Sequence, residues 1–158
     1  MAKAITSNTE KVIKKIEKMA VKMDIDIIKV FFYVGEKMTE IARSLPAGQS
    51  YEDQTSNLRS SIGYIVTRNS EIVQASSFQA IASSTTQEVG AEGAQIGKEY
   101  IESLIGKNDY ELIQAAGMEY AKFVQAMPGR DVIMGVELQG EAQLKKLLGR
   151  LNKKTYKI

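Results

Sequence analysis

The stretch that decides the fold is YEDQTSNLRSSIGY, residues 51–64, which separates two segments of different character. A long pattern of apolar residues with helical spacing precedes it, and a segment with strand-forming composition follows it. Within the stretch, Thr55 or Asn57 can bind free backbone groups of a turn while Leu58 and Ile62 pack inward. We therefore interpret it as a capped turn that joins a helical part of the chain to a strand-forming part.

Before this turn, the spacing of apolar residues predicts one helix over about residues 7–45. Ser7 and Glu10 fit a capping box, in which the serine oxygen accepts a backbone N–H and the glutamate reaches back to the cap. Pro46 and Gly48 are expected to end the helix. The mean apolar spacing is about 3.7 residues, close to the ~3.6 of a straight helix. The apolar positions are Val12, Ile16, Met19, Met23, Ile27, Val30, Val34, Met38, Ile41 and Leu45.

Such a helix is longer than the domain that the chain can build. It measures ~58 Å at ~1.5 Å per residue, whereas a compact domain of this size is ~26–30 Å across. Either the helix breaks near Asp24 or Gly35 and folds back, or part of its apolar face extends beyond the chain's own core and packs on another subunit. The residues that we predict to form this oligomer interface are Ile27, Val30, Val34 and Met38.

After the turn, the sequence predicts a small, mostly antiparallel sheet. Residues 63–68 and 71–75 read as a hairpin around a tight turn at residues 69–70. Residues 110–116 read as a further strand. Residues 118–125 fit either a strand or a helical turn, and their pattern does not decide between the two.

The remaining segments are predicted to be a polar loop and two helices. Residues 76–97 are rich in Ser, Thr, Gly, Ala and Gln, which predicts a loop or an extended arm that becomes ordered on assembly. Residues 97–105 resemble a short helix. A C-terminal helix follows Asp131, a plausible N-cap. We therefore predict a single α+β domain over residues 1–158. The apolar face of the C-terminal helix consists of Val132, Ile133, Val136, Leu144, Leu147, Leu148 and Leu151.

The composition argues against several classes of function. The chain contains no Cys and no His, so disulfides, thiolate nucleophiles, the commonest general base and the commonest transition-metal ligand are all missing. Asp24 and Asp26 lack the further oxygen ligands that a cation site needs. No apolar run approaches the ~20 residues of a membrane span, and the N-terminus lacks a signal-peptide core. We predict a protein that is not an enzyme, binds no cofactor or metal, and does not contact a membrane.

Charge is unevenly distributed along the chain. The net charge is +2, but residues 1–23 carry +4 and residues 141–158 carry +5, which leaves −7 for residues 24–140. This pattern is typical of solvated helix ends, or of charge complementarity between subunits or with an acidic partner. Several clustered bases are also what non-specific binding to DNA phosphates requires. The candidate contacts to DNA or to an acidic partner are Lys145, Lys146, Arg150, Lys153, Lys154 and Lys157.

Two patches of the sequence resemble one family. Residues 55–62, TSNLRSSI, resemble the T-G-N-L-R-x-S-I signature of the phage head–tail connector family, the neck or tail-completion proteins of long-tailed phages. Residues 115–125, AAGMEYAKFVQ, resemble that family's G-x-x-Y-A-x-Y-V-E element and are followed by GRDV. Order and spacing agree over roughly residues 7–151. The family glycine is Ser56 here, and the family glutamate is Gln125. The matching residues of the turn are Thr55, Asn57, Leu58, Arg59 and Ile62.

This resemblance implies a structural virion protein, located in the neck between capsid and tail and assembled in the host cytoplasm. Connector relatives form cyclic rings, commonly twelve-fold, beneath the portal and its adaptor and above the tail. The implied partners are further copies of the chain, a portal or adaptor protein, a tail protein, and the genomic DNA that passes through the channel.

Another class of function stays open from the residues themselves. The chain also fits a small cytoplasmic adaptor or nucleic-acid-associated protein that uses its basic termini. A salt-dependent DNA shift by the isolated protein favours this second class, whereas concentration-dependent rings without DNA favour the connector.

Overall fold

The N-terminal part of the chain is one long helix. The computed structural model describes residues 2–45, 55–81 and 90–155, and helix α1 spans Ala2–Ser44. The predicted start at Ser7 is wrong, because the chain is already helical five residues earlier. Residues 1–6 of the sequence include no proline or glycine that would oppose a helix.

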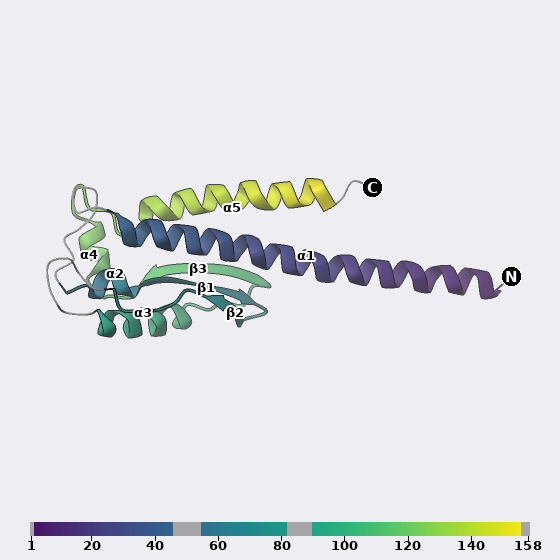
Figure 1. Ribbon diagram of the computed structural model, residues 1–158, viewed down its shortest axis with the longest axis horizontal. Coiled ribbons are helices and arrows are strands. Elements are labelled where there is room, and N and C mark those ends of the chain that lie inside the picture. Colours follow the sequence, from purple (N-terminus) through teal and green to yellow (C-terminus); the bar gives the residue numbers. More distant parts are fainter. Residues whose placement is uncertain (1, 46–54, 82–89, 156–158) are drawn as a thin grey trace.

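Helix α1 continues through both positions at which the sequence allows a break. Asp24 and Gly35 are helical, so the helix does not fold back, and its 43 residues measure about 65 Å. Figure 1 shows that its N-terminal half extends beyond the rest of the molecule. Pro46 and Gly48, which were expected to end the helix, lie outside the described residues.

Three antiparallel strands form the sheet, in the order β2-β1-β3. Strand β1 (Ile62–Arg68) and strand β2 (Glu71–Ala75) form the predicted hairpin. Its turn residues Asn69 and Ser70 both have positive φ, 51° and 66°, as expected for a tight hairpin turn. Strand β3 spans Tyr110–Ala116, as predicted, and pairs with β1 along its whole length.

The fold is α+β, as predicted: a long N-terminal helix, a small antiparallel sheet and a C-terminal helix. Helix α1 covers one face of the sheet and helix α3 (Ala91–Ser103) covers the other, as Figure 1 shows. Helix α5 (Met134–Thr155) packs along the outer side of α1. The central strand β1 is therefore buried from Ile62 to Thr67, since layers of side chains lie on both of its faces.

Helix α3 corrects the prediction of a loop over residues 76–97. The helix begins at Ala91, and the reason for its glycine-rich start is close packing against α2 (Asn57–Ser61). A Cβ atom on Gly93 would lie 2.0 Å from the carbonyl oxygen of Asn57, so only glycine fits there. The middle of the predicted loop, residues 82–89, lies outside the described residues.

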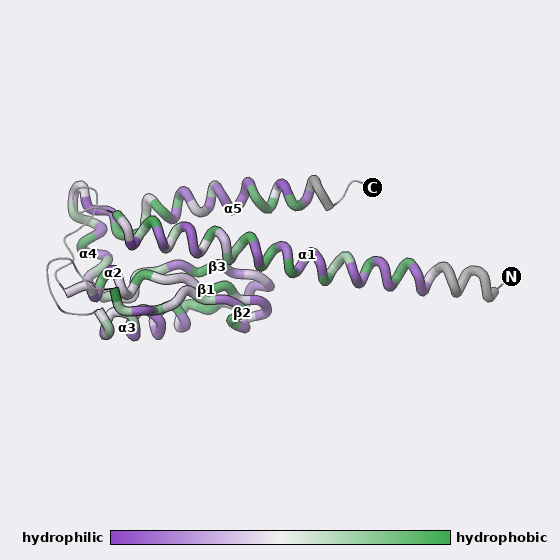
Figure 2. Tube along the Cα trace, in the orientation of Figure 1, coloured by the Kyte–Doolittle hydropathy of each residue, from purple (hydrophilic) through white to green (hydrophobic). Residues whose placement is uncertain are grey.

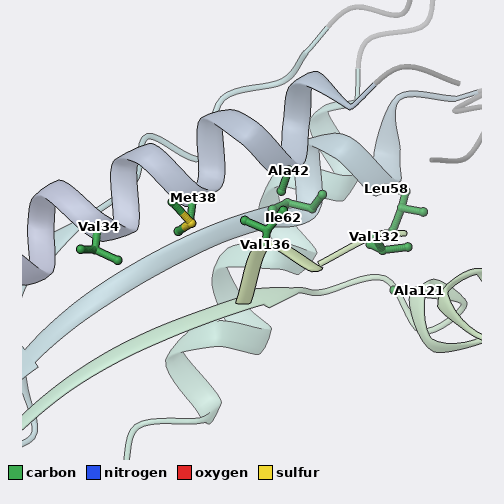
Figure 3. Close-up of a cluster of buried hydrophobic side chains, with 8 residues drawn as sticks. All are labelled: Val34, Met38, Ala42, Leu58, Ile62, Ala121, Val132 and Val136. Atoms are coloured by element: carbon green, nitrogen blue, oxygen red, sulfur yellow. The ribbon is translucent and has the colours of Figure 1, made fainter. Parts of the chain in front are cut away.

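The hydrophobic core packs the C-terminal half of α1 against the rest of the chain. Figure 3 shows its main cluster, to which α1, α2, β1, α4 (Ala121–Gln125), α5 and the segment before α5 all contribute. A second cluster lies further along the sheet, around Phe31, Tyr64 and Val66. The residues of the main cluster are Val34, Met38, Ala42, Leu58, Ile62, Ala121, Val132 and Val136.

Candidate functional site

The turn that carries the family resemblance holds the ends of two helices. The Arg59 guanidinium donates to the carbonyl oxygens of Arg43 (2.7 Å) and Leu45 (2.8 Å), at the C-terminal end of α1. Such cations satisfy the free carbonyls of a helix end and complement its dipole. Arg59 is half-buried, and these two contacts are structural.

Asn57 caps the other helix. Its Oδ1 accepts the backbone N–H of Gly93 at 3.1 Å, in the first turn of α3, and its Nδ2 donates to Glu92 at 3.3 Å. Thr55 Oγ1 accepts the Asn57 N–H at 3.4 Å. Leu58 and Ile62 are 2% and 0% exposed, so they pack inward as the interpretation of a capped turn requires. The residues of this turn therefore hold helices in place rather than present reactive side chains to a ligand.

Ser56, between Thr55 and Asn57, has an unusual backbone. Its φ is 61° and its ψ is 1°, in the left-handed region that favours glycine. Its side chain is buried, and Oγ has no hydrogen-bond partner among the described residues. Glycine, the residue of the family signature at this position, is therefore the residue that this backbone suits best.

The four predicted interface residues of α1 divide into two kinds. Val34 and Met38 are 1% and 3% exposed and lie in the chain's own core, so they offer no surface to another copy. Their assignment to an oligomer interface is corrected accordingly: α5 and β1 cover this part of the helix. Ile27 packs partly on the second core cluster. Val30 is half-buried and lines a groove between α1 and α5.

The apolar face of α1 is uncovered further toward the N-terminus. We call residues 9–25 the projecting segment. Figure 2 shows that apolar residues continue along it, past the end of the sheet and of α5. The sequence alone places this exposed surface too far toward the C-terminal end of α1, because it does not show where α5 ends and stops covering α1. The stripe that faces the same way as the core residues consists of Val12, Ile13, Ile16, Met19 and Met23, which are 37–60% exposed.

Asp24 anchors the helix at the point where the projecting segment leaves the body. Its carboxylate accepts hydrogen bonds from the Arg68 guanidinium and the Tyr110 hydroxyl, at the end of the β1–β3 pair. The hydrogen bond to Asp24 raises the pKa of Tyr110, and the ring of Tyr110 also packs edge-on against Phe31. Asp24 is therefore a structural anchor rather than a ligand for a cation.

Two further polar contacts hold α1 on the sheet. The hydroxyl of the buried Tyr64 donates a hydrogen bond to Glu36 at 2.7 Å. Burial, and to a smaller extent this hydrogen bond, raises the pKa of Tyr64 strongly. Arg43 donates from Nε and Nη2 to the carbonyl oxygen of Ile62 at 3.0 and 2.6 Å. Burial lowers the pKa of Arg43, while the charge of Glu36 opposes that shift.

A groove between α1 and α5 contains part of the predicted basic cluster. Its volume is about 660 Å³, and Lys146 and Arg150 line it together with Lys29. Its apolar lining includes Val30 and Leu147. We call this surface the α1–α5 groove. Lys29 is a member that sequence reasoning missed, because it is far from the C-terminal bases along the chain.

The other predicted bases are not part of this groove as described. Lys145 is exposed and pairs with Glu141 at 2.5 Å, one turn away on the same helix. Lys153 and Lys154 belong to the last turn of α5, but their side chains are not described, and Lys157 lies outside the described residues.

A residue that the family pattern marked as a departure positions α5. Gln125 Oε1 accepts the backbone N–H groups of Val132, Ile133 and Met134 at 2.9, 3.0 and 3.2 Å. The predicted cap, Asp131, accepts the N–H of Gly135, which is also in the first turn of α5. Helix N-termini have free N–H groups of this kind, so Gln125 is a cap supplied from α4. No local sequence signal marks it, because donor and acceptor belong to different elements.

The described residues show neither a metal centre nor a membrane span. Among them, no group of three or more acidic, His or Cys side chains is placed to hold a metal ion. No helix that the structure describes combines the length and apolarity needed to cross a membrane.

No protein-family model, curated protein or solved structure matches the chain.

Proposed function

We propose that this protein is a structural subunit of a phage neck, which self-associates into a ring between the portal complex and the tail. The observation that carries the proposal is the projecting segment of α1, whose apolar stripe continues the face that is buried elsewhere in the fold. A helix with such a face needs a covering layer. The resemblance of the turn to head–tail connectors supplies the class of assembly.

The exposed stripe supports a multivalent assembly better than a simple pair. Fully burying a large apolar side chain contributes about 1.5–3 kcal/mol. The five side chains of the stripe are already partly covered, at 37–60% exposed, so their further burial contributes on the order of 5 kcal/mol. Micromolar affinity requires about 8 kcal/mol after the costs of association. Each subunit of a ring makes two interfaces, and closure adds effective concentration, which can supply the difference.

In this role the protein acts mechanically. A ring of such subunits surrounds the DNA channel, adapts the portal complex to the tail, and lets the genome pass. Its described polar contacts, such as those of Arg59, Asn57 and Asp24, hold helices and strands in place. Rigid placement of elements is what a subunit under load requires.

A pair of substitutions on α1 tests the proposal. Ile16 and Val21 are 60% and 59% exposed on the same segment, but their side chains are separated by about 140° around the helix. Ile16→Glu places a charge on the stripe, and Val21→Glu is the matched control on the polar side. We expect the native protein and the control to form closed rings at high concentration, and Ile16→Glu to remain monomeric.

Native mass spectrometry and electron microscopy of the purified protein read out the result. A native protein that stays monomeric or grows open filaments contradicts the ring. Equal assembly of the two variants would show that the stripe is not the interface. Circular dichroism confirms that both variants remain helical.

One observation favours a second candidate, a nucleic-acid-associated protein. The α1–α5 groove carries Lys29, Lys146 and Arg150, and the described residues that line it include no acid. Three phosphate contacts predict a slope of about −3 in the logarithm of affinity against the logarithm of salt concentration. A DNA mobility shift with such a slope, lost in Lys146→Gln/Arg150→Gln, would support this candidate. Absence of binding at 50 mM salt would exclude it.

A further inference from the structure

The α1–α5 groove has the chemistry of a binding surface for an acidic segment. Lys29, Lys146 and Arg150 supply positive charge around the apolar side chains of Val30 and Leu147. An occupant that fits must present acidic side chains to these three bases. The projecting segment of another copy does not fit, because it is basic. Its residues 9–23 carry five lysines and two glutamates.

The outer face of α3 has the complementary chemistry. Glu92, Glu99 and Glu102 are exposed there, with Lys98 as the helix's one base. Tyr100, at the side of this acidic row, is 44% exposed. The contacts described for Glu99 and Glu102 are exposed ones within the helix, to Gln95 and to Lys98, and such pairs are weak. A partner can therefore compete for both carboxylates.

The two surfaces lie on opposite sides of the molecule. Figure 1 shows α3 beneath the sheet and the α1–α5 pair above it, and the contacts of both layers with β1 agree with that arrangement. Complementary patches on opposite sides produce head-to-tail contacts, which close into a ring when each step adds a fixed rotation. A twelve-fold ring needs ~30° per step.

We infer that the α1–α5 groove of one copy binds the acidic outer face of α3 of the next. Glu99 and Glu102 are ~4.5 Å apart along their helix and Lys146 and Arg150 are ~6 Å apart along theirs. Two helices laid against each other thus bring both pairs within reach. This inference rests on the proposed self-assembly and adds a second pair of contacting surfaces to the apolar stripe of the projecting segment.

Charge reversal on each side tests the inference. The groove variant is Lys146→Glu/Arg150→Glu, and the α3 variant is Glu99→Lys/Glu102→Lys. Lys107→Glu/Lys122→Glu is the control: it changes the net charge as much as the groove variant does, at exposed positions before β3 and on α4, outside the groove. Native mass and sedimentation are measured for each protein alone and for mixtures, with circular dichroism to confirm folding.

Each variant alone should be monomeric, and the control should assemble like the native protein. A mixture of the groove variant and the α3 variant should assemble again, because every junction between unlike copies has opposite charges. Such rings alternate the two proteins and therefore contain an even number of copies, which their mass reveals.

Other results overturn the inference. Rings formed by either variant alone, with Ile16→Glu still monomeric, place the interface elsewhere and leave the proposed function standing. A native protein that is monomeric at every concentration removes both. A groove variant that assembles normally but loses DNA binding assigns the groove to nucleic acid instead.

Discussion

Replacing Ser56 by glycine should stabilise the protein by about 1–2 kcal/mol. A non-glycine residue at a left-handed φ such as 61° costs roughly 1–2 kcal/mol. A buried hydroxyl without a partner costs about 1–3 kcal/mol, and Ser56 Oγ is such a group among the described residues. Against these gains, glycine adds about 0.5–1 kcal/mol of chain entropy to lose on folding, and the missing methylene removes about 0.8 kcal/mol of burial.

The assay is urea unfolding, followed by circular dichroism on native protein, Ser56→Gly and Ser56→Ala. Alanine removes the hydroxyl but keeps the Cβ atom that disfavours a left-handed backbone. Both variants should therefore have higher unfolding midpoints than the native protein with an unchanged slope, and the alanine variant isolates the contribution of the hydroxyl. A glycine variant less stable than the native protein would refute the reasoning. The left-handed backbone and the hydroxyl without a partner would then not cost the native protein the free energy assigned to them.

Three further changes test other contacts. Gly35→Ala should lower the free energy of unfolding, measured in urea, by about 1–3 kcal/mol, because the new Cβ atom would lie 2.4 Å from Cδ2 of the buried Tyr64 ring; an unchanged free energy would mean that the ring moves freely. Gln125→Ala should cost about 0.5–2 kcal/mol through loss of the cap of α5, whereas Gln125→Glu keeps an acceptor and should retain most of the stability. Raising the pH above the ordinary tyrosine value of ~10 should destabilise the protein. The folded-state pKa of Tyr64 is raised, so its contribution is complete below that value and is lost as the pH rises. Tyr64→Phe should flatten this dependence, and a thermal melt that drops equally steeply with pH in that variant would contradict the assignment.

The sequence predicts local elements well where one physical signal dominates. Residues 110–116 match β3, and the tight turn at residues 69–70 has the positive φ angles that a hairpin needs. The start of α3 was missed because Gly93 lowers helix propensity. Its glycine is explained by the approach of Asn57, a contact 36 residues away.

The candidate surfaces were harder to predict, because they depend on which elements cover one another. The apolar spacing identifies the stripe on α1, but Val34 and Ile16 are equivalent in that pattern. Only the packing of α5 and the sheet separates them, at 1% and 60% exposed. The groove has the same origin: Lys29 joins Lys146 because two antiparallel helices lie side by side.

The unbroken α1 gives the projecting segment a fixed rotational phase relative to the body. Because Asp24 holds the helix on the sheet and the helix continues on both sides of it, the core determines the direction in which the exposed stripe points. One residue inserted between Met23 and Asp24 turns the stripe by about 100°, whereas eleven residues turn it by only about 20° while moving it outward by about 16 Å. Insertions in the helix can therefore vary the direction in which the stripe faces and its distance from the body separately.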